Sequence, residues 1–522
     1  MTPIAAIVRE KLDSASRRLL EEIRNPALYA FIEEAVNLTE PDKIRVFSDS
    51  SKDIAKIRRL ALNGGGEHPL KMEGHTYHFD GPNDQGRDPF STRYLLPKDM
   101  DLGASLNSID RTEGLGEVKG FLKGSMRGKT MLICFWCLGP LHSDFSIPCV
   151  QITDSPYVAH SESILCRPGC ELFKKLPEDA DFFRFLHSEG ETDENGCSIH
   201  WQKRRVYIDL IENTVYSVNT QYAGNTVGMK KLALRLAIQK ASREGWLAEH
   251  MFIMGVKGPQ RRTTYFVGAF PSACGKTSTA MLPGQTIIGD DIAYFRKRKG
   301  KMYCANVEQG IFGIICDVNP VDDPVIYKAL VSPGEVIFSN VLVADGKPYW
   351  EGMGCELPER GINFQGEWYK GKKDAEGKEI PPSHKNARYT IRLSALDNLD
   401  PQAENPEGVL VGGIIYGGRD SNTLVPIEQA FNWVEGIITK GASIESETTA
   451  ATIGQAGVPK FNIMANQDFV SIPLGRYIQN NLDFANEVEN PPPIFSVNYF
   501  LRDENHQFLT GKLDKMVWLL WA

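Results

Sequence analysis

The hydrophobic positions of the first 63 residues recur with a helical period, as in REKLDSASRRLLEEI (residues 9–23). Three glycines at 64–66 end this pattern, because glycine destabilises helices. Beyond them, short apolar runs typical of β-strands occur at HTYHF, TMLICFWCL, CVQIT and RVYIDLI, with turn-forming residues between them. The pattern predicts an N-terminal α+β domain that spans residues 1–220.

The second half opens with a predicted amphipathic helix, in which the apolar residues from Met229 to Ala237 recur at i, i+3, i+4, i+7 and i+8. The run TTYFVGAF predicts a strand, which is followed by the loop PSACGKTST, a short helix from about Thr277, and a second strand, TIIGDD. Further strands and helices are predicted at EVIFSNVLVA, VLVGGIIYGG and FNWVEGIITKGA. We therefore expect a mixed α/β protein with a second, larger α/β domain at residues 221–522.

The composition is that of a globular protein. Of the 522 residues, 42% are hydrophobic and 24% charged, and the formal net charge is −8, which favours neither nucleic-acid binding nor disorder. No apolar stretch is long enough for a signal peptide or a membrane span, so we expect a cytoplasmic protein. The ten cysteines are scattered, which indicates reduced thiols, and the CxxC of Cys134 and Cys137 is predicted to lie in a buried strand.

The segment PSACGKTST is the strongest candidate for chemistry. Lys276 and Thr277 complete a Gly-Lys-Thr between a predicted strand and a predicted helix, where a lysine can neutralise phosphate and a hydroxyl can bind the associated divalent ion. Phe270 replaces the leading glycine of G-x-x-x-x-G-K-[ST]. Asp290 and Asp291 end the next strand, where they could bind metal or could simply be solvated.

Three further residues stand in suggestive places. Cys274 lies where loop N–H groups could lower its thiol pKa, or it could be a small residue that fits a tight loop. His250 precedes an apolar run, where a lone histidine is more often a core residue than a ligand. Arg419 follows a strand and a Gly-Gly turn in IIYGGRDSN, a place suited to bidentate binding of carboxylate or phosphate.

These stretches together resemble one family, the GTP-dependent phosphoenolpyruvate carboxykinases. The resemblance covers roughly residues 75–510 and rests on FPSACGKT, GDDIAY, EGWLAEHM, ITDSPYV, YAGN, NAR (386–388), YWEG, IIYGGR and SETTAA. It implies a two-domain carboxykinase fold with a substrate-binding N-terminal domain and a P-loop-containing C-terminal nucleotide-binding domain. It also implies reversible conversion of oxaloacetate and GTP to phosphoenolpyruvate, CO2 and GDP by a monomer or small homo-oligomer, with a mobile lid near 441–457.

The resemblance assigns a role to each candidate residue. It implies a catalytic Mn²⁺ held by His250, Asp291 and either Lys230 or Lys231, and a nucleotide-bound Mg²⁺ or Mn²⁺ attended by Thr277 and Asp290. It implies a substrate pocket of Arg93, Tyr222, Gly224, Asn386 and Arg388, with Arg93, Cys274, Lys276 and Arg388 taking part in catalysis. It implies nucleotide binding by Ser272, Ala273, Cys274, Gly275, Lys276, Thr277, Ser278, Arg419, Phe500 and Phe508.

The sequence departs from the family pattern in two places. The glycine loop at 223–228 is one residue short and begins with Ala223, and the third aromatic residue expected after Phe500 and Phe508 is replaced within TGKLDKMVW. These departures leave pyrophosphate or ATP open as the phosphoryl donor beside GTP, with a non-catalytic metabolite-binding relative as a remote alternative. Relatives continue beyond the position of Ala522, and the apolar end MVWLLWA is expected to pack against another part of the protein.

Overall fold

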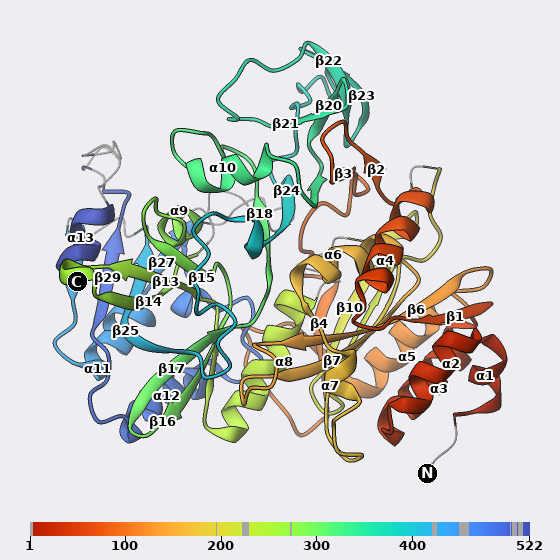
Figure 1. The fold of residues 1–522 in the computed structure, drawn as a ribbon, viewed down its shortest axis with the longest axis horizontal. Helices are drawn as coiled ribbons and strands as arrows, with labels where there is room; N and C mark the ends of the chain where they lie inside the picture. Colours follow the sequence, from red (N-terminus) through yellow and green to blue (C-terminus); the bar gives the residue numbers. More distant parts are fainter. Residues whose placement is uncertain are drawn as a thin grey trace.

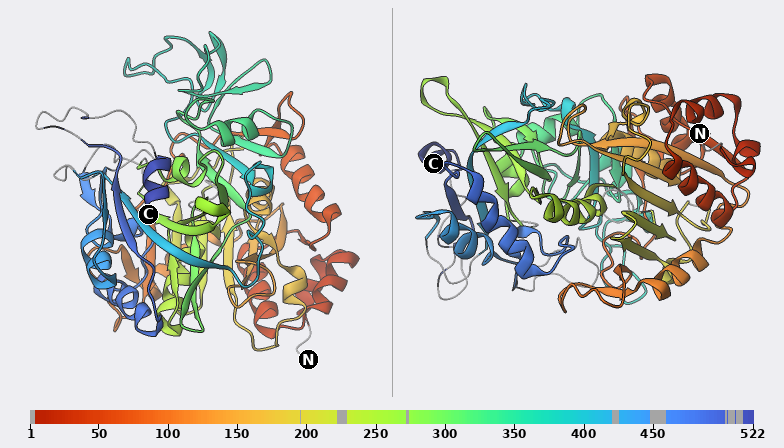
Figure 2. Two further views of the ribbon diagram at one scale, coloured as in Figure 1. Left: turned by 60° about the vertical axis from the view of Figure 1, so that its left-hand side comes forward. Right: turned by 90° about the horizontal axis from the view of Figure 1, so that it is seen from below.

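The computed structural model describes residues 4–194, 196–221, 229–271, 274–419, 425–447, 459–501, 503, 509 and 515–522. In Figure 1 the N-terminal half lies on the right and the C-terminal half on the left, and Figure 2 shows helix α8 (Met229–Glu244) between them. The helices are α1 (Ala6–Lys11), α2 (Ser14–Glu22), α3 (Pro26–Thr39), α4 (Ser51–Asn63), α5 (Arg111–Leu122), α6 (Pro156–Leu165), α7 (Cys170–Phe173), α8, α9 (Lys276–Ala280), α10 (Pro324–Leu330), α11 (Trp433–Glu435), α12 (Leu474–Phe484) and α13 (Lys515–Trp521).

A mixed parallel and antiparallel sheet forms the N-terminal half. Its strands, in spatial order, are β1 (Lys43–Val46), β6 (Thr130–Leu138), β7 (Ile147–Thr153), β9 (Phe183–Ser188), β11 (Thr214–Val218), β10 (Arg205–Asp209), β4 (Thr92–Leu96) and β5 (Ser108–Asp110), with β8 (Arg167–Pro168) beside β6. Helices α1, α2, α3 and α5 pack on one face, against Ile133 and Phe135, while α8 covers the other face with Leu132 and Cys134. Strand β6 is apolar and buried from Met131 to Leu138 because both faces of the sheet are covered.

The CxxC prediction is confirmed by this strand. Cys134 and Cys137 are both buried and free, and burial raises the pKa of the Cys137 thiol to about 11. Residues three apart on a strand point to opposite faces of the sheet. The two sulfurs are therefore core atoms rather than a redox pair.

The C-terminal half is built on a second large sheet, whose central strands are parallel. Its order is β12 (Leu247–Glu249), β16 (Ala293–Arg298), β17 (Lys301–Asn306), β25 (Val409–Gly418), β14 (Thr263–Ala269), β13 (Phe252–Lys257) and β15 (Thr286–Gly289), with β29 (Ile494–Asn498) beside β25 and β26 (Ile427–Gln429) beside β29. Strands β14, β25 and β29 run parallel, and β15 has the same direction because β13 is antiparallel to both β14 and β15. The residues that follow these four strands consequently meet at one edge.

There are two smaller sheets, of which the first joins the N-terminal and C-terminal halves and the second projects from the molecule (Figure 1). The first has the order β18 (Gly310–Ile314), β24 (Arg388–Arg392), β19 (Val336–Ser339), β3 (His75–His78) and β2 (His68–Pro69). The second, at the top of Figure 1, has the order β21 (Lys347–Tyr349), β20 (Leu342–Ala344), β22 (Arg360–Asn363) and β23 (Gly366–Tyr369). Strands β27 (Glu445–Glu447) and β28 (Pro459–Phe461) pair separately.

A buried ionic cluster also ties the halves together at this junction. On α6, His160 places Nδ1 2.6 Å from Oε1 of Glu67 and Nε2 3.3 Å from Oε1 of Glu335, which lies beside β19. Burial favours the neutral ring, but these two carboxylates outweigh it and raise the pKa of His160 to about 9. Parallel pairing of β3 with β19 adds backbone hydrogen bonds across the same junction.

The mixed α/β fold predicted from sequence is confirmed, with one correction. The first 63 residues are not helical throughout, because β1 at Lys43–Val46 pairs in parallel with β6. Strands β2 and β3, which fall within the range predicted for the N-terminal domain, belong to a sheet with C-terminal strands. None of the helices in the described residues is long and apolar enough to cross a bilayer.

Candidate active site

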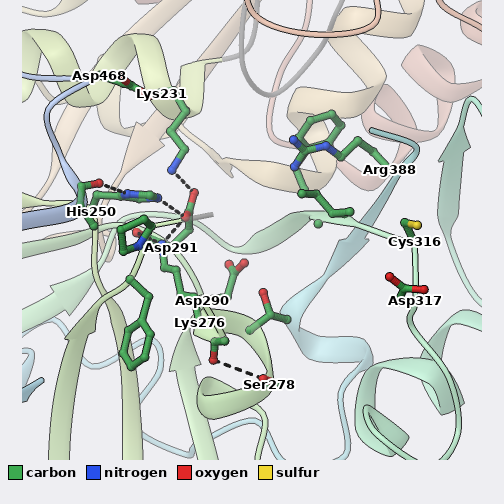
Figure 3. A pocket seen from close by; sticks show the side chains of 18 of the residues that line it. Lys231, His250, Lys276, Ser278, Asp290, Asp291, Cys316, Asp317, Arg388 and Asp468 are labelled. Carbon is green, nitrogen blue, oxygen red and sulfur yellow. Dashed lines mark hydrogen bonds and ion pairs between the residues drawn. The ribbon is translucent and has the colours of Figure 1, made fainter. Parts of the chain in front are cut away.

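A cavity of approximately 570 Å³ opens at the edge where β14, β15, β25 and β29 end. Figure 3 shows Lys231, His250 and Asp291 on one side of it and Arg388, Cys316 and Asp317 on the other. The described residues that line it include Arg87, Lys230, Lys231, His250, Gly275, Lys276, Thr277, Ser278, Asp290, Asp291, Phe312, Arg388, Arg419, Asp468, Phe469 and Phe500. The fold thus brings most of the predicted site residues to one place.

Asp291 is the centre of the polar wall. Its carboxylate lies 2.8 Å from Nε2 of His250 and 2.5 Å from Nζ of Lys231, and Nζ of Lys230 lies 3.0 Å away. Lys276 donates to the same carboxylate and, over 3.0 Å, to the Asp291 carbonyl. Burial opposes ionisation, but the surrounding lysines hold the pKa of Asp291 well below its usual value.

The orientation of His250 suits a metal ligand. Its Nδ1 lies 2.7 Å from the carbonyl oxygen of Ala465, which fixes Nδ1 as the protonated nitrogen. Burial, reinforced by the charges of Lys231 and Lys276, lowers the pKa of His250 to about 3. The neutral ring therefore turns the lone pair of Nε2 toward a carboxylate oxygen, an arrangement of two acceptors that a divalent cation between them would satisfy.

The two adjacent lysines differ in their electrostatics. Burial lowers the pKa of Lys231 well below its ordinary value, and the charges of Lys276 and Lys230 add to this effect. For Lys230, burial is outweighed by Asp291 and by Glu308, whose Oε1 lies 3.1 Å from Nζ, so its pKa is raised. Only a neutral amine can donate a lone pair to a metal, so Lys231 is the better suited of the two.

The donor set at Asp291 fits a transition-metal ion. Among the described residues, no group of three or more His, Cys, Asp and Glu side chains is placed to hold a metal. The Asp291 cluster contains two such residues, and a lysine would complete the set. Beside it, Asp290 is buried, and no described residue donates a hydrogen bond to its Oδ1, which leaves an oxygen ligand available to a second cation.

Aromatic rings pack against the described residues of the loop after β14. Gly275 has φ 95°, and a Cβ there would lie 2.9 Å from the ring of Tyr499. Phe270, in place of the leading glycine, is fully buried and stacks on Tyr499 with ring centroids 6.1 Å apart. Cys274 is buried in the same hydrophobic cluster and is not among the described residues that line the cavity. Its position favours the tight-fit interpretation of this cysteine over a catalytic one.

The opposite wall presents Arg388 from the start of β24. Oδ1 of Asn386 accepts hydrogen bonds from Nε and Nη2 of Arg388, over 3.0 and 2.6 Å. Nδ2 of Asn386 in turn donates to the carbonyl of Gln85 over 2.7 Å. Asn386 is thus a buried support for Arg388. The guanidinium of Arg388 also lies over the ring of Phe312, 5.2 Å from its centroid.

Arg93 does not line this cavity, and Arg87 does. Arg93 lies on β4, where it shares a face with Leu95, which packs in the helix-covered core. The hydrogen bond from Arg205 lowers the pKa of Glu117, on that same side, and the charge of Arg93 adds to this effect. Nε of Arg93 donates to the Phe90 carbonyl over 3.2 Å. Because alternate residues of a strand point to the same side, the side chain of Arg93 lies on the face of Leu95 and not in the cavity. The prediction that Arg93 lines the substrate pocket is corrected accordingly.

The remaining predicted residues fall into two groups. Arg419 and Phe500 both line the cavity, and the Arg419 guanidinium lies 4.0 Å from the centroid of the Phe500 ring. Outside the described residues lie Tyr222, Gly224, Ser272, Ala273, Phe508 and the part of the predicted lid from 448 to 457.

The sequence of this chain matches two models of a known protein family. Residues 30–242 match the phosphoenolpyruvate carboxykinase N-terminal domain, and residues 246–522 match the phosphoenolpyruvate carboxykinase C-terminal P-loop domain. The chain belongs to the phosphoenolpyruvate carboxykinase family. The two matched regions place α8 with the N-terminal domain, whereas the boundary predicted from sequence, at residue 220, placed it with the C-terminal one.

Individual carboxykinases resemble the chain over nearly its whole length. The protein named phosphoenolpyruvate carboxykinase [GTP] from Pyrococcus horikoshii is 54% identical over 98% of this chain and 83% of its own. The protein of that name from Thermococcus kodakarensis is 55% identical over 98% of this chain and 82% of its own. The one from Chlamydia caviae is 36% identical over 96% of this chain and 85% of its own.

Sequence reasoning missed several residues of this carboxykinase site. Arg87 lies in PNDQGRDP, where an arginine beside a glycine in a turn between strands was the available signal. Asp468 forms an ion pair with Arg87, in which Oδ2 lies 3.2 Å from Nη2. The Arg87 guanidinium and Nζ of Lys231 lie over the ring of Phe469, 5.0 and 4.8 Å from its centroid. Asp468 and Phe469 follow the predicted lid in a segment without a periodic pattern, so the sequence offered no signal for them.

Proposed function

We propose that this protein interconverts oxaloacetate and phosphoenolpyruvate with GTP as the phosphoryl donor. The observation that carries the proposal is the facing of two sets of groups across one cavity. The first set is His250, Asp291 and Lys231 beside Lys276, and the second is Arg388 on the opposite side (Figure 3). Arg87 lines the same cavity over the ring of Phe469, which also lies under Lys231. The reaction needs both a cation site and anion-binding arginines within reach of a phosphate loop.

The anionic groups of the substrate fit the two arginines. Arginine binds carboxylate and phosphate through two parallel hydrogen bonds. Arg388 is held by Asn386, so its guanidinium is already oriented toward the cavity. Arg87 reaches the cavity from the N-terminal half. Together they can hold oxaloacetate while CO2 leaves and while the electron pair of the broken carbon–carbon bond moves onto the enolate oxygen.

Phosphoryl transfer then falls to the loop after β14. The enolate oxygen attacks the terminal phosphorus of GTP, the bond from that phosphorus to the bridging oxygen breaks, and GDP leaves. Lys276 can stabilise the transferring group, and Thr277 and Asp290 supply oxygen ligands for the nucleotide-bound cation. A divalent ion at His250, Asp291 and Lys231, which we propose to be Mn²⁺, would supply Lewis-acid stabilisation of the enolate oxygen.

The names of the relatives, each a phosphoenolpyruvate carboxykinase [GTP], favour GTP over the donors that the sequence left open. Phe500 adds an aromatic surface beside Arg419 in the wall of the cavity, where a base could stack. A donor that lacks a base, such as pyrophosphate, would make no use of this surface.

The test is formation of phosphoenolpyruvate from oxaloacetate with Mn²⁺ and GTP, ATP or pyrophosphate, each supplied alone. We expect turnover with GTP and far less with the other two. Turnover with pyrophosphate alone would overturn the donor assignment, and no turnover with any donor would overturn the reaction itself. Lys276→Ala should lose turnover while keeping the thermal stability of the parent, which separates loss of chemistry from loss of folding.

A further inference from the structure

Residues 83–88, which precede β4 and which we name the 83–88 segment, link the N-terminal sheet to the far wall of the cavity. The carbonyl of Gln85 accepts the hydrogen bond from Asn386 that supports Arg388. Two residues later, Arg87 lines the cavity itself. Both arginines of the proposed substrate site therefore depend on where this segment lies.

Asp84 anchors the segment to the N-terminal sheet. Its Oδ1 accepts hydrogen bonds from Nη1 of Arg204 over 2.9 Å and from the hydroxyl of Thr220 over 2.7 Å. Its Oδ2 accepts from the backbone N–H of Gln221, also over 2.7 Å. Arg204 lies just before β10, and Thr220 and Gln221 lie just after β11. Asp84 is 3% exposed and Arg204 is also 3% exposed, so water does not replace these bonds.

A carboxylate suits this position better than any other side chain. Three donors converge on its two oxygens, and the positive charge of Arg204 offsets the negative charge buried with it. Burial raises the pKa of Asp84 to about 6, so the group is charged at neutral pH. An amide has one acceptor oxygen, and its NH2 group would face either the N–H of Gln221 or the guanidinium of Arg204.

The mechanism proposed above makes no use of Asp84, and Asp84 is not among the described residues that line the cavity. We propose that Asp84 is a positioning residue that fixes the spacing of Arg87 and Arg388 and thereby sets the affinity for the carboxylate substrate. The contacts that support this run from Thr220 and Gln221 to Asp84 by hydrogen bonds, from Asp84 to Gln85 through the peptide bond, and from the Gln85 carbonyl to Asn386 and Arg388 by further hydrogen bonds. The inference rests on the proposed function, because it names the substrate whose binding is affected.

The chain supplies a matched control in Asp88. Its Oδ2 accepts a hydrogen bond from Nη2 of the same Arg204, over 2.8 Å. Its other hydrogen bonds come from Phe90 and Ser91 rather than from the residues after β11. Asp88→Asn therefore weakens one ion pair between Arg204 and the 83–88 segment. It leaves the hydrogen bonds of Asp84 to Thr220 and Gln221 in place.

The experiment compares steady-state kinetics of the parent, Asp84→Asn and Asp88→Asn. We expect Asp84→Asn to raise the KM for oxaloacetate about tenfold, the size of effect of losing one hydrogen bond to a charged group. The KM for GTP and the affinity for Mn²⁺ should stay within about twofold, because Lys276 and Asp291 lie on other elements. Asp88→Asn should shift every constant by less than about threefold. A merely structural role would lower kcat and thermal stability without this selective rise in KM.

A milder variant keeps the inference testable if Asp84→Asn does not fold. Thr220→Val removes one donor and preserves the pair of Asp84 with Arg204, and it should raise the KM for oxaloacetate about threefold. A folded Asp84→Asn with a KM unchanged, or shifted no more than that of Asp88→Asn, would overturn the inference. If the parent turns over with no donor, the proposed function fails, and calorimetric titration of parent and variants with oxalate and Mn²⁺ then tests the anchor by affinity alone.

Discussion

Replacing Phe270 by glycine would restore the leading glycine of the G-x-x-x-x-G-K-[ST] pattern, and we expect this change to damage the protein. The Phe270 ring is fully buried, with its centroid 5.7 Å from that of Phe252 and 6.1 Å from that of Tyr499. Gly417 on β25 approaches so closely that a Cβ there would lie 2.0 Å from the ring. Removing a buried phenylalanine side chain costs about 3–5 kcal/mol, and the added freedom of glycine costs about 1 kcal/mol more.

Scanning calorimetry measures this loss directly. For a domain of the size matched to the P-loop family, 1 kcal/mol corresponds to about 2 °C in Tm, so Phe270→Gly should lower the Tm of the C-terminal domain by about 10 °C. Phe270→Leu keeps most of the apolar volume and should cost about 3 °C. A Phe270→Gly variant that melts within about 2 °C of the parent, or that binds GTP more tightly, would refute the view that Phe270 supports the loop.

Other predictions follow from the charges and the placement of single residues. Lys231→Met should weaken Mn²⁺ binding, measured by titration calorimetry, by about 100-fold and more than Lys230→Met, because burial lowers the pKa of Lys231 whereas Asp291 and Glu308 raise that of Lys230; equal losses would contradict this assignment. The pKa of His160 in the folded protein is raised above its unfolded value of about 6.5. Its pairing with two carboxylates should therefore add about 3 kcal/mol to the free energy of unfolding below pH 6.5, and this contribution should be lost as the pH rises through 9. Tm measured from pH 6 to 10 should show that decline in the parent, and a His160→Gln variant with the same decline would exclude this histidine as its source. Arg87→Lys should raise the KM for oxaloacetate about tenfold, and Arg93→Lys should leave it unchanged; the reverse order would restore the sequence-based assignment.

The periodic parts of the fold could be predicted from sequence. The runs TMLICFWCL and VLVGGIIYGG coincide with β6 and β25, and the apolar face beginning at Met229 coincides with α8. Strand β1 was missed because its four residues, KIRV, are too few to interrupt a helical pattern. The pairing of β3 with β19 joins residues about 260 positions apart, and no local pattern encodes a contact at that separation.

The site also contains residues that a local motif could predict and residues whose role depends on contacts distant in the chain. Lys276, Asp291 and His250 lie in motifs whose spacing is local, and the structure brings them together. Sequence could not distinguish Lys230 from Lys231, because the difference between their pKa values depends on contacts distant in the chain: Asp291 and Glu308, 78 residues beyond Lys230, raise the pKa of Lys230.

The arrangement around Asp291 also shows how phosphate and metal binding can support each other. One carboxylate receives Lys230, Lys231 and Lys276, and its negative charge cannot neutralise three ammonium groups. Glu308 compensates Lys230, and burial favours the neutral form of Lys231. Burial lowers the pKa of Lys276 as well, but its ion pair with Asp291 opposes this effect, and Lys276 is also the lysine of the phosphate loop. A bound phosphate would compete with Asp291 for Lys276 and so leave the carboxylate lone pairs to a divalent ion. By reciprocity, a metal at Asp291 would release Lys276 toward phosphate, so the ion pair of Lys276 with Asp291 couples the two binding events.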